Sequence, residues 1–213
     1  MSRRLILPDG VRLADEDEIP GPPSTRAELW GRVQAANLSP GFVLHDSNDP
    51  RFALYVEANI DAPQIWNVFE ALCLALFDAG ASLLVNDVDD ETSPTRGEAH
   101  AMSLVQLLAP HRYQLAHDGR VQFGLVHQGP QAIVEVLVAP TKHFMVWTSD
   151  AAALRDVFAA HDVPEVNALE FLDQFPRATF PLDPERTGAT VIPDLVERLR
   201  GAAATLTPHS QRL

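Results

Sequence analysis

The sequence of 213 residues contains a single cysteine, Cys73, and a single lysine, Lys142. One thiol excludes a disulfide within the chain, and with no second cysteine there is no zinc-ligand spacing. Because no basic residue lies near it in the sequence, we expect Cys73 to be a buried, unreactive thiol on a helix. No apolar run approaches the roughly 20 residues of a membrane-spanning helix, so the sequence predicts no membrane span.

Three short motifs that mark common enzyme active sites are also missing. The sequence contains no GxSxG nucleophile turn, no GxxxxGKS/T phosphate loop and no GxGxxG after a predicted strand. Many enzymes lack these motifs, so their absence favours a non-catalytic protein without excluding an enzyme. The histidines are scattered and have no HExxH context, and we expect neither a bound metal nor a cofactor.

Positive charge is scarce. The chain has 16 Lys and Arg residues against 29 Asp and Glu residues, which gives a formal net charge of −13. Binding to nucleic acid generally needs a basic surface that displaces counterions, so this balance argues against a nucleic-acid partner. It favours another protein with a basic surface, whose encounter the negative field would accelerate.

The composition and the start of the chain also bear on source and location. The basic residues are nearly all arginine, and alanine and proline are plentiful, as in proteins from GC-rich and often bacterial genomes. The first apolar run, Leu5 to Leu7, is shorter than the roughly 7–15 residues of a signal-peptide core. We therefore expect a bacterial protein of the cytoplasm.

The stretch from Arg120 to Thr148 predicts three successive strands, because apolar side chains alternate along it. The side chains expected to share a face are Val121, Phe123, Leu125 and His127 in the first strand, Ala132, Val134, Val136 and Val138 in the second, and His143, Met145 and Trp147 in the third. The breaks at 128–131 and 139–141 are too short for a crossover helix, so these strands should be antiparallel neighbours.

Other segments complete an α+β pattern. Alternation predicts strands over 52–60, 82–88 and 113–117, and the first two could form a parallel pair around the intervening helix. Helices are predicted over 24–38, 61–80, 98–109 and 150–160, and from Pro193 onward. The sequence thus favours an α+β fold: a mixed, mostly antiparallel sheet with helices mainly on one face.

The predicted organisation is one domain with short appendages. Residues 1–23 form an N-terminal strand and an acidic, proline-rich arm, which we interpret as solvated and flexible. Residues 24–206 form the single α+β domain, and 207–213 a frayed tail.

An acidic loop follows the strand 82–88. Its spacing resembles a calcium-binding frame, with acidic residues at Asp87, Asp89, Glu91 and Glu98. Thr92 stands where that frame needs glycine, and Pro94 stands where it needs an apolar residue, so the pattern argues against calcium. We interpret the loop as a solvated contact for a basic partner, with Asp87, Asp89, Asp90 and Glu91 as its binding residues.

One combination of side chains could support catalysis. His127, Glu135 and His143 lie on three neighbouring predicted strands, and a suitable register could bring them together as an acid–base or metal site. The alternative is that the histidines are structural or lie at the surface, because they share faces with apolar residues.

These observations leave three hypotheses. The first is a non-catalytic, cytosolic protein-binding module, in its most concrete form a bacterial immunity protein that neutralises a basic toxin. The second is a hydrolase or small-molecule-binding enzyme that uses His127, Glu135 and His143 in a cleft beside the sheet. The third is a structural component of a larger complex.

Overall fold

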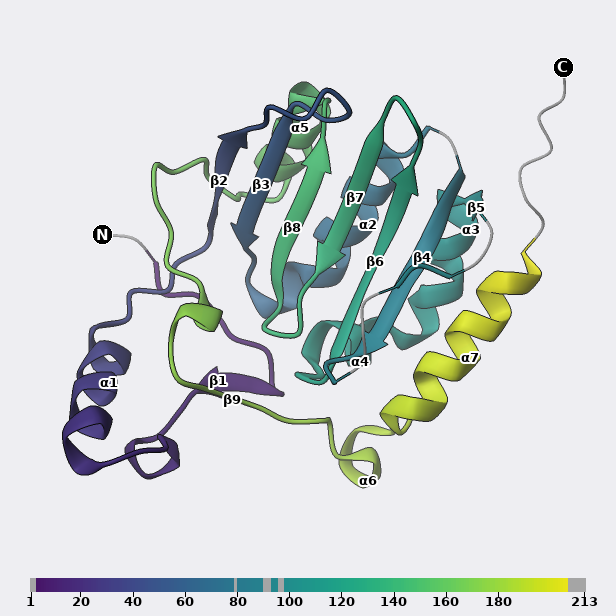
Figure 1. The fold of residues 1–213 in the computed structure, drawn as a ribbon. Coiled ribbons are helices and arrows are strands. Elements are labelled where there is room, and N and C mark those ends of the chain that lie inside the picture. Colours follow the sequence, from purple (N-terminus) through teal and green to yellow (C-terminus); the bar gives the residue numbers. More distant parts are fainter. Residues whose placement is uncertain (1–2, 79, 90–92, 96–97, 207–213) are drawn as a thin grey trace, which may run out of the picture.

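The computed structural model describes residues 3–78, 80–89, 93–95 and 98–206. A seven-stranded sheet lies at its centre, and each neighbouring pair in it is antiparallel (Figure 1). In spatial order its strands are β2 (Gly41–Asp46), β3 (Leu54–Asn59), β8 (His143–Thr148), β7 (Ile133–Val138), β6 (Val121–Gln128), β4 (Gly80–Asp87) and β5 (Ala99–His100). This arrangement confirms the predicted α+β fold and the meander of β6, β7 and β8.

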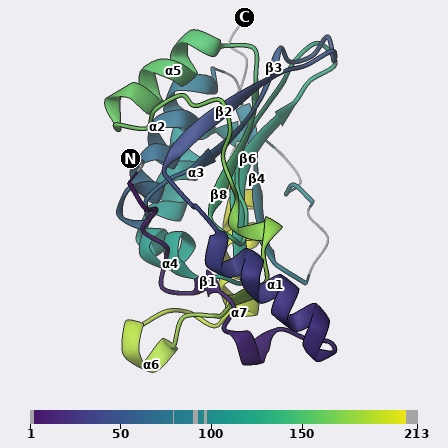
Figure 2. The same ribbon diagram turned by 90° about the vertical axis from the view of Figure 1, so that its left-hand side faces the viewer.

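Helices cover one face of this sheet. The helices α2 (Ile65–Leu76), α3 (Ala101–Leu108) and α5 (Ala151–Ala160) lie behind the strands in Figure 1, and α7 (Ile192–Thr205) packs beside β4. Figure 2 shows α2, α3 and α5 together on one side of the strands, whereas the helix of residues 23–35 lies below the sheet toward the other side. The other α-helices of the described residues are α1 (Pro23–Ala35), α4 (Arg112–His117) and α6 (Pro184–Thr187).

The helix α2 supplies much of the main core, because its apolar residues surround most of its circumference. Phe69 and Cys73 are fully buried, and the Phe69 ring meets the Phe123 ring of β6 edge-on at a centroid distance of 4.8 Å. Burial raises the pKa of the Cys73 thiol well above its ordinary value, so the buried thiol that the sequence predicts is confirmed.

The two faces of the sheet carry separate apolar clusters. The main cluster joins the helices to the strand residues that point toward them, such as Val56, Leu125 and Val146. A smaller cluster of Leu84, Val126 and Leu137 lies on the opposite face, together with the partly buried Met145 and Trp147. We call this opposite face, which carries no helix across the described strands, the open face.

The turn between β7 and β8 places the only lysine inside the protein. Lys142 has a φ of 65°, the left-handed region, at the end of a turn closed by its N–H donating to the Ala139 carbonyl oxygen. Glycine adopts this conformation more readily. The lysine side chain is nevertheless buried there, and its ammonium donates to the main-chain oxygens of Leu115 and Val121 at 2.9 and 2.5 Å.

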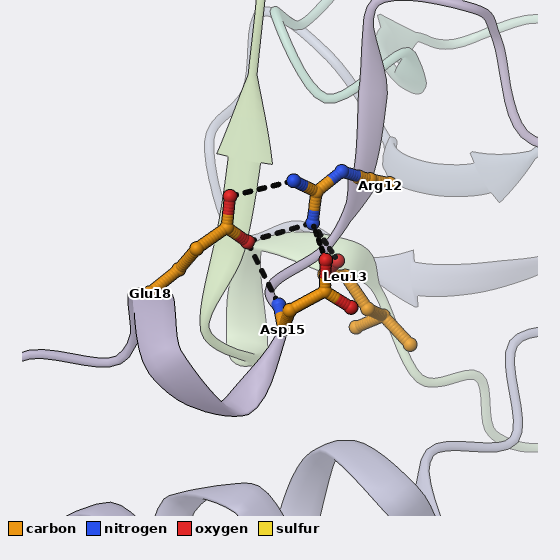
Figure 3. Close-up of polar contacts among 4 residues, drawn as sticks. All are labelled: Arg12, Leu13, Asp15 and Glu18. Carbon is orange, nitrogen blue, oxygen red and sulfur yellow. Dashed lines mark hydrogen bonds and ion pairs between the residues drawn. The ribbon is translucent and has the colours of Figure 1, made fainter.

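The acidic N-terminal segment is anchored rather than free, contrary to the flexible arm predicted from its composition. Strand β1 (Val11–Leu13) pairs with β9 (Arg177–Thr179), and the short 3₁₀ helix Glu16–Glu18 folds back against β1. The Arg12 guanidinium binds both Glu18 carboxylate oxygens at 2.6 and 2.7 Å (Figure 3). This contact lowers the pKa of Glu18 to about 2. Ile19 beyond it is almost fully buried.

Two sequence predictions were wrong, and one strand was missed. Residues 113–117 are helical in α4, because Leu115 and Ala116 are buried on one side of a helix too short to display a period. Strands β3 and β4 do not pair, because β8, β7 and β6 lie between them. Strand β2 was missed because turn-forming residues lie at both of its ends, Pro40 before it and Ser47 after it.

Candidate functional site

The strand register aligns the side chains of the open face in rows. The first row crosses six strands through His45, Tyr55, Trp147, Glu135, Val126 and Ser82. The second row lies two residues away from the first on each strand. It contains Val43, Glu57, Met145, Leu137, Gly124 and Leu84. Directly opposed side chains in a sheet lie close enough to interact, so each row forms a continuous surface.

Three rings stand side by side in the first row. The rings of His45 and Tyr55 are stacked at 5.7 Å between centroids, and those of Tyr55 and Trp147 lie 4.9 Å apart and tilted by 37°. Tyr55 and Trp147 are half-buried, whereas His45 at the edge strand is exposed. Such a row offers rigid apolar area together with polar edges, a combination that is common in binding surfaces.

Glu57 is a carboxylate of the second row that already has partners. Its Oε2 lies 3.3 Å from His45 Nε2, and its charge acts on the nearby Tyr55 hydroxyl. Burial and the nearby Glu57 charge raise the pKa of Tyr55, so this phenol stays protonated at neutral pH. Glu57 therefore serves to hold the ring row in place.

Glu135 differs from Glu57 in having no such partner. It lies directly opposite Trp147 on one side and Val126 on the other. Burial among these neighbours raises the pKa of its carboxyl, and no hydrogen bond or ion pair joins it to any residue of the described segments. A partly buried carboxylate without a donor is unfavourable, and an arriving cation or hydrogen-bond donor would relieve that cost.

His143 shares the open face with Glu135 but lies far from it. Its Nδ1 is 2.9 Å from the Thr141 Oγ1, and its ring lies against Phe171 with centroids 5.3 Å apart. Burial lowers the pKa of His143, while Asp173 and Glu57 act in the opposite direction. His143 is four residues along β8 from the partner of Glu135, which corresponds to about 13 Å.

His127 lies on the other face of the sheet. It is opposite Val134, and its Nδ1 lies 2.9 Å from the Gly80 carbonyl oxygen and 3.4 Å from the Glu98 carboxylate. The structure therefore does not bring His127, Glu135 and His143 together. Strand alternation puts His127 and Glu135 on opposite faces, and distance separates Glu135 from His143.

The described start of the acidic loop, residues 87–89, lies beside α7. Asp87 follows the alternation of β4 onto the helix-covered side, and Arg120 binds Asp87 at 2.7 Å and Asp89 at 2.5 Å. Both carboxylates line a hollow of about 530 Å³ beside α7. Asp90 and Glu91 lie outside the described residues. Within the described segments, no group of three or more His, Cys, Asp or Glu side chains could hold a metal ion.

The sequence did not single out Tyr55 and Glu57 as site residues. It also did not show that Trp147 and Glu135 are neighbours. The alternation in β3 indicated that Tyr55 and Glu57 share a face, but only the register shows which side chains of β8 and β7 they meet.

No helix in the described part of the chain is both long and apolar enough to cross a membrane.

Comparisons with known proteins add no relative. No protein-family model matches the sequence, and no curated protein or solved structure matches the chain.

Proposed function

We propose that the protein is a non-catalytic binding module that holds a basic segment of another protein against its open face. The observation that carries this proposal is the first row, in which two half-buried aromatic rings stand beside the Glu135 carboxylate, which no residue of the described segments binds. The rings supply apolar contact area and the carboxylate supplies a charge that a basic side chain can match.

The charge of the whole chain supports a basic partner. A net charge of −13 raises the rate of encounter with a positive surface, while the affinity comes from a few well-packed contacts. Asp87, Asp89, Asp90 and Glu91 remain proposed as steering charges. Because Arg120 already binds two of them, we assign them to the encounter and not to the central contact.

The most concrete form of this proposal is a bacterial immunity protein that masks a basic toxin in the cytoplasm. A toxin that acts on nucleic acid needs a basic surface, and an acidic protein with a rigid sheet face suits such a surface. The alternative enzyme hypothesis relied on His127, Glu135 and His143 forming one site, and these three residues are separated in the structure.

The test is affinity capture from the native host with three versions of the protein, at several salt concentrations. Tyr55→Ala removes the middle ring of the row, and Leu74→Ala alters an exposed residue on the helix layer as the matched control. We expect a basic protein that both the wild type and Leu74→Ala retain, that Tyr55→Ala loses, and that elutes as salt rises. Retention by Tyr55→Ala, or no salt-sensitive partner at all, would reject the proposal.

A further inference from the structure

We infer that Glu135 and Trp147 together form a recognition point for one arginine side chain of the partner. This inference rests on the proposed function, because it assigns a specificity to the same open face. It goes further in naming the residue type that the site selects and the two side chains that select it.

The positions of the two side chains suit a single planar cation. Glu135 and Trp147 are directly opposed on β7 and β8, and side chains so placed have Cβ atoms about 4.5–5.5 Å apart. A planar cation resting on the indole can therefore direct its N–H groups at the adjacent carboxylate. The strand pairing fixes this geometry before any ligand arrives, which lowers the entropy cost of binding.

Tyr55 holds the indole from one side. It lies on the β3 side of Trp147, with ring centroids 4.9 Å apart. The tyrosine thus covers one flank of Trp147, and the cluster of Leu84, Val126 and Leu137 packs against the indole as well. The part of the ring that stays exposed is the part that the ligand would meet. Trp147 is half-buried, so part of its surface is accessible.

Glu135 differs from Glu57, the other carboxylate of this part of the face. Glu57 lies 3.3 Å from the His45 imidazole, whereas Glu135 has no hydrogen-bond or ion-pair partner among the described residues. A carboxylate that lacks a donor gains most from a charged one. Glu135 is therefore the anion of the site, and Glu57 supports the rings.

Arginine suits this pair better than lysine does. A guanidinium is planar, stacks on aromatic faces, is weakly hydrated and offers two parallel N–H groups to a carboxylate. A lysine ammonium is compact and strongly hydrated, so it loses more solvation on reaching a half-buried carboxylate. Indole is also the ring that binds cations best among the aromatic side chains.

The experiment uses Trp147 as its own reporter. The chain has three tryptophans, and replacing two of them (Trp30→Phe and Trp66→Phe) leaves Trp147 as the only source of indole fluorescence. The probes are octa-arginine, octa-lysine and octa-citrulline, of which the last keeps the planar shape of arginine without its charge. Each is titrated at several salt concentrations into this background and into the same background carrying Glu135→Gln or Glu57→Gln.

We expect octa-arginine to change the Trp147 fluorescence and to bind about tenfold or more tightly than octa-lysine, with no response to octa-citrulline. Glu135→Gln should weaken octa-arginine about tenfold, and Glu57→Gln clearly less, with thermal melting confirming that both variants fold. Equal affinities for the arginine and lysine peptides, or equal effects of the two variants, would overturn the inference. So would a failure of every peptide to change the fluorescence.

These outcomes separate the inference from the proposed function. If arginine and lysine peptides bind equally while Tyr55→Ala still abolishes capture of the native partner, the open face binds basic proteins without arginine selectivity. If Tyr55→Ala leaves capture intact, the open face is not the binding surface, and both statements fail.

Discussion

The ammonium nitrogen of Lys142 lies 2.9 Å from the main-chain oxygen of Leu115, in the last turn of α4. The side chain reaches this oxygen from the turn between β7 and β8 and also binds the Val121 oxygen at the start of β6. A cation at the end of a helix meets carbonyl groups that have no partner within the helix. The single lysine thus ties α4 to two neighbouring strands.

This burial makes the stability depend on pH. Burial lowers the pKa of Lys142 to about 7, against the opposing charge of Asp118, while the unfolded chain keeps a pKa near 10.5. Between these values the unfolded state binds more protons, so the free energy of unfolding should rise with pH, by at most about 1.4 kcal/mol per unit. Below about pH 7 both states are protonated, and the contribution of Lys142 is constant.

The measurement is urea unfolding between about pH 7.5 and 9.5, a range that lies between these two pKa values. Cys73→Ala serves as the background, because a native thiol with a raised pKa would lower stability as pH rises in the same range. Adding Lys142→Met should abolish the slope. An identical slope with and without Lys142 would show that this lysine does not titrate as described.

Cys73 should resist thiol reagents in the native protein. It is fully buried within α2, and burial favours its unreactive thiol form. We expect labelling to be slow in native buffer and to become fast on adding denaturant. Native labelling as fast as that of the unfolded chain would contradict the packing of α2.

Phe69→Ala should destabilise the fold strongly. Phe69 is fully buried between the rings of Trp66 and Phe123, and removing such a side chain typically costs about 3–5 kcal/mol. Leu74→Ala on the exposed side of the same helix should change the free energy of unfolding by no more than about 0.5 kcal/mol. Urea unfolding of both variants checks the contrast, and equal losses would refute the orientation of α2.

Neutralising the acidic loop should slow association without abolishing binding. A variant with Asp87→Asn, Asp89→Asn, Asp90→Asn and Glu91→Gln removes steering charge but leaves the open face intact. We expect a lower association rate with the captured partner and a weaker dependence on salt, since the lost charges no longer act over the Debye length of about 10 Å at 0.1 M salt. A changed dissociation rate with an unchanged association rate would assign the loop to the central contact instead.

Much of the fold follows from local patterns. The alternation from Val121 to Trp147 predicted three antiparallel strands and, apart from Ala132, which precedes β7, it correctly assigned the residues that share a face within each strand. The helix predicted over 61–80, with Cys73 buried, is likewise confirmed, and the structure places it at Ile65–Leu76. These features depend on periods of 2.0 and 3.6 residues, which the sequence displays directly.

The site could not be predicted in the same way, because it depends on register. Glu135 meets Trp147 only because the turn before Lys142 pairs Val138 with Phe144, and a shift of one residue would put the two side chains on opposite faces. The burial of Lys142 depends on the end of α4, a helix too short to be recognised from its pattern. The geometry of one turn decided the first case, and a contact between separate elements decided the second.

The central claim is that the open face is covered when the partner binds. The most direct measurement is acrylamide quenching of Trp147 fluorescence in the Trp30→Phe, Trp66→Phe background, with and without the captured partner. Trp147 is half-buried in the free protein, so the account predicts measurable quenching that falls sharply in the complex. Quenching that is the same in the free protein and in the complex would contradict the account, because the open face would then lie outside the interface.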